Sequence, residues 1–298
     1  MNIETKIEIP REAFDWYDSY AHGMMDRREF MDRLSTIAVG GLTMAMLTSA
    51  LIPNYAKAQQ VNFNDEDIKA TYVTFPSPDG HGEGRGYMVQ PTSLAEGQTA
   101  PTVLVVHENR GLNPYVMDVA RRLAKSGFVA LAPDALHPLG GYPGNDDEGR
   151  SMQSSLDRSK IEQDFVAAAK FLNAHALSSG KTGVVGFCFG GYISNYLAAA
   201  IPDVIDAAVP YYGTPAATEI VGNVRCPIMG QLAKDDERVN TAWGPYEEIL
   251  KANNVSYTIH IYPGTMHGFH NDSTGRFVKD MAQLSWDRTL EFFNMHLG

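Results

Sequence analysis

The sequence predicts an α/β fold, in which a mostly parallel, twisted sheet carries helices on both faces. From residue 61 onward, short apolar runs alternate with longer helix-like segments, which is typical of such a sheet. A second observation is the glycine-rich stretch at 186–191, which joins an apolar run to a helix-like run. A third is that an acidic residue and a histidine each follow a later apolar run. Acidic and histidine side chains at the carboxyl ends of parallel strands are typical of an active site.

The elements are predicted from periodicity and from turn residues. Residues 68–75 and 86–89 form a leading antiparallel pair around a turn-rich segment at 77–82. Buried strands are predicted at 102–107, 128–132, 184–187, 207–212, 227–232 and 257–262. Helices are predicted at 114–126, where Gly127 stops the helix, and at 156–177, 192–200, 241–252 and 277–296, with a long loop at 133–149. Without a repeat or a low-complexity linker, residues 59–298 form one predicted catalytic domain.

Composition excludes some functions. The chain has 298 residues, with a hydrophobic fraction of 44% and a charged fraction of 20%, ordinary for a soluble protein with a large core. Its formal net charge of −11, without a basic cluster, argues against a nucleic-acid partner. The two cysteines, Cys188 and Cys226, do not suggest a disulfide framework. Cys226 begins an apolar run and is interpreted as a core residue.

Residues 1–58 form a separate predicted unit. An arginine pair, Arg27 and Arg28, precedes an uncharged stretch at 34–56, and an Ala-x-Ala site ends at Ala58. This order resembles a twin-arginine export signal, which predicts cleavage after Ala58 and a periplasmic enzyme.

Two other interpretations of this unit stay open. Residues 1–33 hold five basic and eight acidic side chains, whereas an export signal is normally basic at this end. Residues 11–34 also resemble an amphipathic helix, which favours a retained extension on a cytoplasmic enzyme, packed on the domain or on a second subunit of a homo-oligomer. The third interpretation is an uncleaved anchor at 34–56, the one case that implies membrane contact.

The stretch at 186–191 has the pattern Gly-x-Cys-x-Gly between a strand and a helix, which is a nucleophile elbow with cysteine in place of serine. The nucleophile would be Cys188, which needs a base and an orienting acid. His267 follows the last predicted strand and is the predicted base, ahead of His270 and His107. The predicted acid is Asp236, preferred to its neighbour Asp235 because the Asp-x-x-Val pattern turns a valine inward.

An oxyanion hole needs two backbone donors. One is the predicted amide of Phe189, directly after the nucleophile at a helix start, and the other is the amide of Asn109, on the loop after an earlier strand. His267 and His270 have His-x-x-His spacing, but the sequence offers no third ligand. We therefore expect neither a metal site nor a cofactor.

With these residues in place, the chain resembles the dienelactone hydrolase family over residues 68–297. The resemblance rests on five motifs together: His107-Glu108-Asn109-Arg110-Gly111-Leu112-Asn113, Ala132-Pro133-Asp134, Gly186-Phe187-Cys188-Phe189-Gly190-Gly191, Asp236-x-x-Val239 and Tyr262-Pro263-Gly264-x-x-His267-Gly268-Phe269. It implies an α/β-hydrolase fold with a Cys-Asp-His triad on Cys188, Asp236 and His267. It also implies that Glu108 holds the thiol inactive until substrate binds. The alternative is that Glu108 only pairs with Arg110 or another cation.

One departure concerns the substrate. Family members that open dienelactones hold the substrate carboxylate with two arginines, one after the Ala-Pro-Asp strand and one four residues past the histidine. Residues 135–140 contain no arginine, and Asn271 stands at the second position. Arg110, Arg150 or Arg276 could substitute, but nothing in the sequence requires it, so an anionic lactone is not the expected substrate. The chain also resembles a branch of the family with an N-terminal extension.

The sequence thus predicts a cysteine-dependent hydrolase of a small ester or lactone, similar to carboxymethylenebutenolidase, that works through a thioester acyl-enzyme. Two alternatives remain. One is acyl transfer to an alcohol or amine on the same triad. The other is a non-catalytic binding module with the hydrolase fold.

Overall fold

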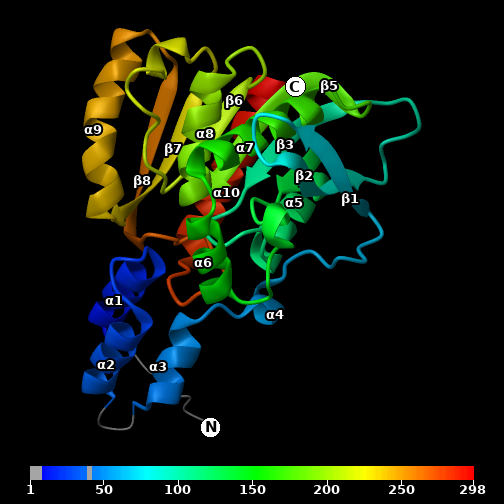
Figure 1. Cartoon of the computed structure of the whole chain (residues 1–298). Coiled ribbons are helices and arrows are strands. Elements are labelled where there is room, and N and C mark those ends of the chain that lie inside the picture. Colours follow the sequence, from blue (N-terminus) through cyan, green and yellow to red (C-terminus); the bar gives the residue numbers. More distant parts are fainter. Residues whose placement is uncertain (1–8, 39–41) are drawn as a thin grey trace.

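A computed structural model describes residues 9–38 and 42–298 of the chain, and one sheet organises them (Figure 1). The strand order is β1-β2-β4-β3-β5-β6-β7-β8. The β1–β2 and β2–β4 pairs are antiparallel, and every pair from β4 to β8 is parallel. The bounds are β1 Ile68–Ser77, β2 Gly82–Pro91, β3 Ala100–Val106, β4 Val129–Pro133, β5 Ser178–Phe187, β6 Ala207–Tyr211, β7 Ile228–Asp235 and β8 Tyr257–Met266. The predicted α/β-hydrolase fold is confirmed.

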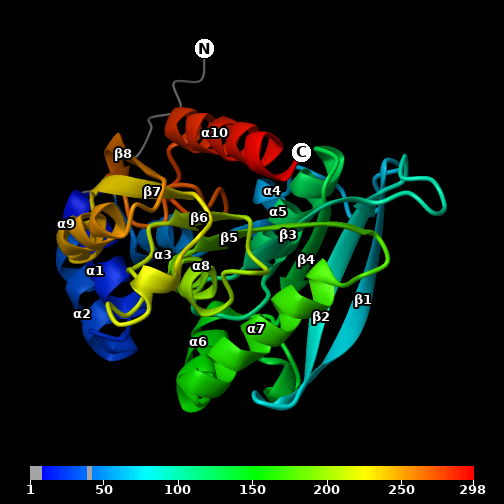
Figure 2. The same cartoon turned by 90° about the horizontal axis from the view of Figure 1, so that it is seen from above.

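Helices cover both faces of the sheet (Figure 2). The helices α5 (Pro114–Lys125) and α10 (Lys279–Leu297) pack on one face. The helices α7 (Arg158–Asn173), α8 (Phe189–Ala200) and α9 (Glu237–Ala252) pack on the other face. A further helix, α6 (Asp146–Ser155), and two 3-10 turns, His137–Leu139 and Val221–Asn223, lie in the connections.

The central strands are apolar on both faces because both faces are covered. In β3, Val103 and Val105 pack toward α5 and α10, whereas Leu104 and Val106 pack toward α7 and α8. Alternate side chains of a strand point to opposite faces, so a single apolar run serves two core layers. This explains why the pattern of residues 102–107 predicted a strand without polar alternation.

Several predicted boundaries were wrong, most clearly those between α7 and β5. The helix predicted at 156–177 begins only at Arg158, where the Asp157 carboxylate caps the amides of Ser159 and Lys160. It ends at Asn173, because β5 already starts at Ser178 and pairs with β3. The strand predicted at 184–187 is therefore the carboxyl half of a longer strand.

The N-terminal unit consists of four helices: α1 (Arg11–Ala21), α2 (Arg27–Ile37), α3 (Met44–Leu51) and α4 (Tyr55–Ala58). The single amphipathic helix predicted at 11–34 is two helices. The break lies at Gly23, whose φ of +75° is a left-handed conformation that glycine adopts freely and that ends α1. Asp26 then caps α2 by accepting from the amide of Glu29.

A small core of its own holds α1, α2 and α3 together. Its buried members are Ala13, Tyr17, Tyr20, Ala21, Met25, Phe30, Leu34 and Leu51. The uncharged stretch at 34–56, of which residues 39–41 lie outside the described part, contains the end of α2, the short α3 and the start of α4. In the described residues, no helix has both the length and the apolar character needed to cross a membrane. Export and localisation stay predictions.

The elbow gives a stability prediction. A Cβ on Gly190 would run into the backbone carbonyl oxygens of Val106 and His107, so Gly190→Ala forces α8 away from β3. We expect it to lower the free energy of unfolding by about 3 kcal/mol, the upper range for overpacked sites, as measured by urea denaturation.

Gly244→Ala is the matched control, because nothing lies within 4 Å of a Cβ at this position of α9. Alanine is the better helix former by about 1 kcal/mol, so this variant is expected to be as stable as the unchanged chain or more so. Equal stability of both variants would show that the approach of α8 to β3 is looser than described.

Candidate active site

Four predicted site residues lie directly beyond the carboxyl ends of four strands. Glu108 follows β3, Cys188 follows β5, Asp236 follows β7 and His267 follows β8. Because these strands are parallel, their carboxyl ends lie at one edge of the sheet, where ligands bind in open α/β folds. The topology therefore brings together side chains that are up to 159 residues apart in the sequence (267 − 108).

The thiol stands on a strained turn. Cys188 has φ +56° and ψ −111°, a conformation that costs a non-glycine residue free energy and that the surrounding backbone must hold. Its amide donates to the carbonyl oxygen of Tyr211 at 3.0 Å. A Cβ on Gly186 would collide with the Gly190 carbonyl, so the tight turn requires glycine there. The strain directs the sulfur out of the sheet edge at the start of α8.

Asp236 and His267 form a close pair. Nδ1 of His267 lies 2.6 Å from Oδ2 of Asp236, and both side chains are buried. Burial opposes both charges. The His267 charge outweighs burial and lowers the pKa of Asp236, while the Cys188 thiolate and Asp236 together raise the pKa of His267 to about 10. The neighbouring Asp235 instead faces Arg11 of α1 at 3.2 Å. The carboxylate that reaches the imidazole is therefore that of Asp236.

The two competing histidines are occupied elsewhere. His270 is buried, and its Nδ1 lies 2.7 Å from the Tyr115 hydroxyl. Burial, reinforced by the Arg122 charge, holds the pKa of His270 well below its usual value. Nδ1 of His107 donates to the Glu108 carbonyl, while its Nε2 accepts from the amide of Ala135 at 3.1 Å. Neither ring is within hydrogen-bond distance of the sulfur in the described residues.

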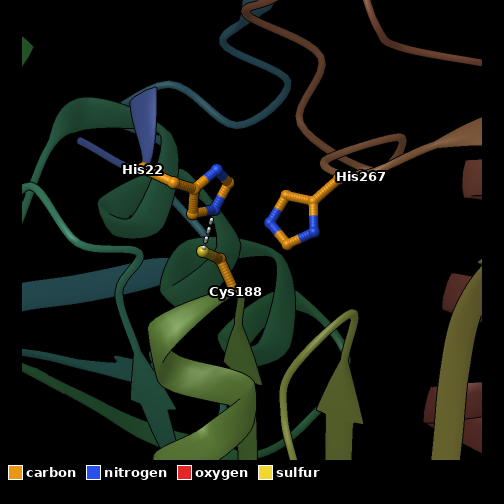
Figure 3. Close-up of side chains that lie close together, drawn as sticks. All are labelled: His22, Cys188 and His267. Atoms are coloured by element: carbon orange, nitrogen blue, oxygen red, sulfur yellow. Dashed lines mark hydrogen bonds between the residues drawn. The ribbon is translucent and has the colours of Figure 1, made fainter. Parts of the chain in front are cut away.

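The hydrogen-bond partner of the sulfur comes from the N-terminal unit. Nε2 of His22 lies 3.4 Å from Sγ of Cys188, and its ring meets the His267 ring edge-on with centroids 4.7 Å apart. Figure 3 shows the two imidazoles next to each other at the thiol. Sequence reasoning missed His22. Its one local signal is a histidine directly before the glycine that ends an amphipathic helix.

The end of α1 is fastened to the catalytic domain at three points, which fix His22. The Asn109 side-chain amide donates to the Ala21 carbonyl at 2.9 Å. The Arg276 guanidinium pairs with Asp18 at 2.8 Å, and the Arg150 guanidinium donates to the Tyr20 carbonyl. Figure 1 shows α1 next to the loop that follows β8. The N-terminal unit thus forms part of the wall of the site.

The imidazoles stabilise a thiolate. Burial raises the pKa of Cys188, but the charges of His267 and His22 outweigh it and hold that pKa well below its usual value. Burial lowers the pKa of His22, but the thiolate and the Asp18 side chain outweigh it, so the pKa of His22 is raised. Arg238 adds a positive charge, with Nη2 3.2 Å from Nε2 of His22. Such an environment is typical of a reactive cysteine.

Glu108 is buried beside this cluster. Burial raises its pKa, the nearby Arg110 lowers it, and a Cys188 thiolate raises it. Its Oε2 accepts from the side-chain amide of Asn271 at 3.1 Å. Arg110 forms its ion pair with Asp146, at 2.7 Å, and not with Glu108. The Glu108 carboxyl group is therefore held near the thiol by the side-chain amide of Asn271.

Two cavities are lined by residues that lie around the thiol. One, of about 500 Å³, is lined by His22, Asn109, Phe189, Arg150, Arg158 and their neighbours. The other, of about 200 Å³, is lined by His267, Asp236, Asp18, Arg238 and Arg276 among others. The residues of the predicted oxyanion amides, Asn109 and Phe189, therefore both line the larger cavity.

Three ligand atoms of the site would also suit a metal ion. The side-chain nitrogens of His22 and His267 and the sulfur of Cys188 all lie within 4.8 Å of one another. Two imidazoles and a thiolate are ligands that zinc accepts. The expectation that the site needs no metal stays a prediction.

Comparison with known proteins agrees with this geometry. The model of the dienelactone hydrolase family matches residues 85–297, and a family described as YqhI-like matches residues 1–40. The protein is 60% identical to the Escherichia coli "Putative hydrolase fragment YghX" over 39% of this chain and 97% of that protein. It is 33% identical to the Aquifex aeolicus "Putative carboxymethylenebutenolidase" over 72% of this chain and 94% of the relative.

Among solved structures, a dienelactone hydrolase-like promiscuous phosphotriesterase, P91, from metagenomic libraries shares the fold. It has a TM-score of 0.67 at 23% identity, over 78% of this chain and all (100%) of that one. The family match spans most of the sheet and every strand end that carries a site residue. The chain belongs to the dienelactone hydrolase family of α/β-hydrolases, and it carries a YqhI-like N-terminal extension.

Proposed function

We propose that this protein hydrolyses a small ester or lactone through a thioester on Cys188. The observation that carries the proposal is the thiol on a strained elbow, with a pKa held well below the usual range and an Asp236–His267 pair beside it. Nucleophile, oriented imidazole and carboxylate are the parts that acyl transfer to a side chain requires.

The reaction has two halves. The Cys188 thiolate attacks the carbonyl carbon, and the electron pair of the carbonyl π bond moves to its oxygen. The amides of Phe189 and Asn109, which donate to no other described residue, stabilise this oxyanion. Collapse expels the alcohol and leaves a thioester. Water then adds to the thioester, the carbon–sulfur bond breaks, and the acid leaves. His267, with its Nδ1 held by Asp236, carries protons between the reacting groups.

The larger cavity is the proposed substrate site. Its volume of about 500 Å³ suits a small molecule, and it borders both proposed oxyanion donors. Of the three arginines considered as replacements for the missing carboxylate clamp, Arg110 and Arg276 are already paired with Asp146 and Asp18. Arg150 lines the cavity. A carboxylate-bearing ester or lactone would therefore meet Arg150, and the name of the Aquifex aeolicus relative supports a lactone.

The nucleophile is tested by Cys188→Ala in the full chain. We expect the fold to persist and the turnover of p-nitrophenyl esters and lactones to disappear, because the second cysteine, Cys226, is buried in the core and cannot replace the Cys188 thiol. The assays are steady-state release of p-nitrophenol and circular dichroism.

Cys226→Ala is the matched control. Cys226 is buried in the core, and burial raises the pKa of its thiol to about 12. This variant is expected to turn over at the rate of the unchanged chain. Activity retained in Cys188→Ala would remove the thioester from the mechanism.

The role of Glu108 is tested by Glu108→Gln. The substitution keeps a partner for Asn271 and removes an acid whose charge disfavours a neighbouring thiolate. We expect iodoacetamide to alkylate Cys188 several-fold faster in the substrate-free variant, an effect in the usual range for a nearby charge. Glu248→Gln, on the exposed side of α9, is the control. An unchanged alkylation rate would exclude gating by Glu108.

The pH dependence of alkylation tests the electrostatics. Because the pKa of Cys188 is lowered, its thiol stays deprotonated at lower pH than an ordinary thiol does. The alkylation rate should therefore stay flat from about pH 9 to about pH 6, a range over which an ordinary thiol loses most of its thiolate. Asp236→Asn removes a charge that raises the pKa of His267, so the imidazolium is lost at lower pH and the pKa of Cys188 rises. The alkylation rate of Asp236→Asn should therefore increase as pH rises through the neutral range, whereas the rate of the unchanged chain stays flat. Superimposable profiles would contradict this account.

A further inference from the structure

The site contains two imidazoles, and they differ in what they touch. Nε2 of His22 is within hydrogen-bond distance of the sulfur, at 3.4 Å. Nε2 of His267 is buried and has no hydrogen-bond partner among the described residues. Figure 3 shows the His22 ring directly above the thiol and the His267 ring next to it, on the right. A site with one general base would need only one of them, so the second requires an explanation.

The contacts of His22 determine which nitrogen carries its proton. Nδ1 lies 2.8 Å from the backbone carbonyl oxygen of Asp18, which can only accept, so Nδ1 donates. In the neutral ring the lone pair is then on Nε2, which lies within hydrogen-bond distance of both the sulfur and the Arg238 guanidinium. The Asp18 carboxylate, 3.4 Å from Nδ1, stabilises the ring once it is protonated. His22 thus has an aspartate near its Nδ1, as His267 does, but its closest partner there is a backbone carbonyl.

The charges around His22 also allow its ring to bind a proton and to release it again. Arg276 neutralises Asp18 at 2.8 Å, and the Arg238 guanidinium lies 3.2 Å from Nε2. His267 faces the same ring edge-on. These positive groups on the loop after β8 and on α9 oppose a permanent imidazolium, while the thiolate and Asp18 favour it. A group balanced in this way can take a proton and give it back.

The two cavities separate the imidazoles. His22 lines the larger cavity together with Asn109 and Phe189, and His267 does not. His267 lines the smaller one, with Asp236 and Arg238, and His22 does not. The leaving group of a substrate in the larger cavity would therefore meet His22, whereas water in the smaller cavity would meet His267.

We propose that His22 is a catalytic residue, the acid–base partner of Cys188 in acylation, and that His267 serves deacylation. This rests on the proposed function. At rest the thiol proton is on Nε2 of His22. The thiolate forms the carbon–sulfur bond, the tetrahedral adduct expels the alkoxide, and the alkoxide takes this proton. The thioester lacks the thiolate charge that favours a protonated His267, so His267 gives its Nε2 proton to solvent. Water then gives one proton to Nε2 of His267 and its hydroxide to the thioester carbon. The carbon–sulfur bond breaks with its electron pair on sulfur, which restores the thiolate beside the His267 imidazolium, and His22 takes a proton from solvent.

The experiment is burst kinetics on the full chain with p-nitrophenyl acetate. His267→Gln is expected to release one equivalent of p-nitrophenol per protein and then to stall, with one acetyl group on Cys188 detected by mass spectrometry. His22→Gln keeps a polar group near the sulfur but cannot take its proton, and its burst is expected to be at least about 100-fold slower. His260→Gln, on the half-exposed side of β8, is the control and should match the unchanged chain.

A role in catalysis is separated from a role in packing by His22→Ala. Imidazole added in solution is expected to restore part of its burst rate, which a purely structural defect would not allow. A burst of His22→Gln as fast as that of the unchanged chain would overturn the proposal. A faster burst would also overturn it, because His22 would then be a plug that blocks the thiol. Absence of an acetyl group on Cys188 in every protein, the unchanged chain included, would instead overturn the proposed function.

Discussion

The close approach of the Gly190 backbone to the end of β3 is the constraint on which the site depends. Only a glycine lets α8 begin against the Val106 and His107 carbonyls, and the turn that allows it forces Cys188 to a positive φ. The same contact places the loop with Glu108 and Asn109 beside the sulfur. The proposed nucleophile, the proposed oxyanion amides and the buried acid are therefore positioned by one close contact between two backbones. Their relative geometry is set by the sheet and by close packing.

Around this turn, positively charged side chains compensate the buried negative charge of the thiolate. A thiolate with low solvent exposure is unfavourable unless cations lie close to it. Here the cations are two imidazoliums, each with an aspartate behind it, and the guanidiniums of Arg238 and Arg276 hold the group near neutrality. The N-terminal unit supplies half of this arrangement, through Asp18 and His22. It completes the electrostatics of the site as well as its wall.

Much of this could be predicted from local sequence. Cys188, Asp236 and His267 each follow an apolar run that is recognisable as a strand, and the order of parallel strands brings their ends together whatever the details of packing. The boundary between α7 and β5 could not be predicted, because residues 174–177 are as compatible with a helix as with a turn until β5 pairs with β3.

His22 could not be predicted for a different reason. It lies 166 residues from Cys188, in a unit whose arginine pair and uncharged stretch suggested export. The position of α1 depends on side-chain contacts such as that between Asp18 and Arg276. No periodic sequence pattern predicts such contacts. A catalytic role of His22 would require residues 1–58 to stay on the mature enzyme, which is incompatible with removal after Ala58.

The position of His22 also has a consequence for biosynthesis. The ribosome makes α1 before the loop with His267, which follows 245 residues later (267 − 22). A site that takes groups from both segments cannot exist on a nascent chain that still lacks His267. Until the loop after β8 has been made and has packed, the thiol lacks His267, and α1 lacks the Arg276 contact that helps to fix His22. Folding itself then acts as the activation step, because a thiol without neighbouring cations keeps its ordinary, low reactivity.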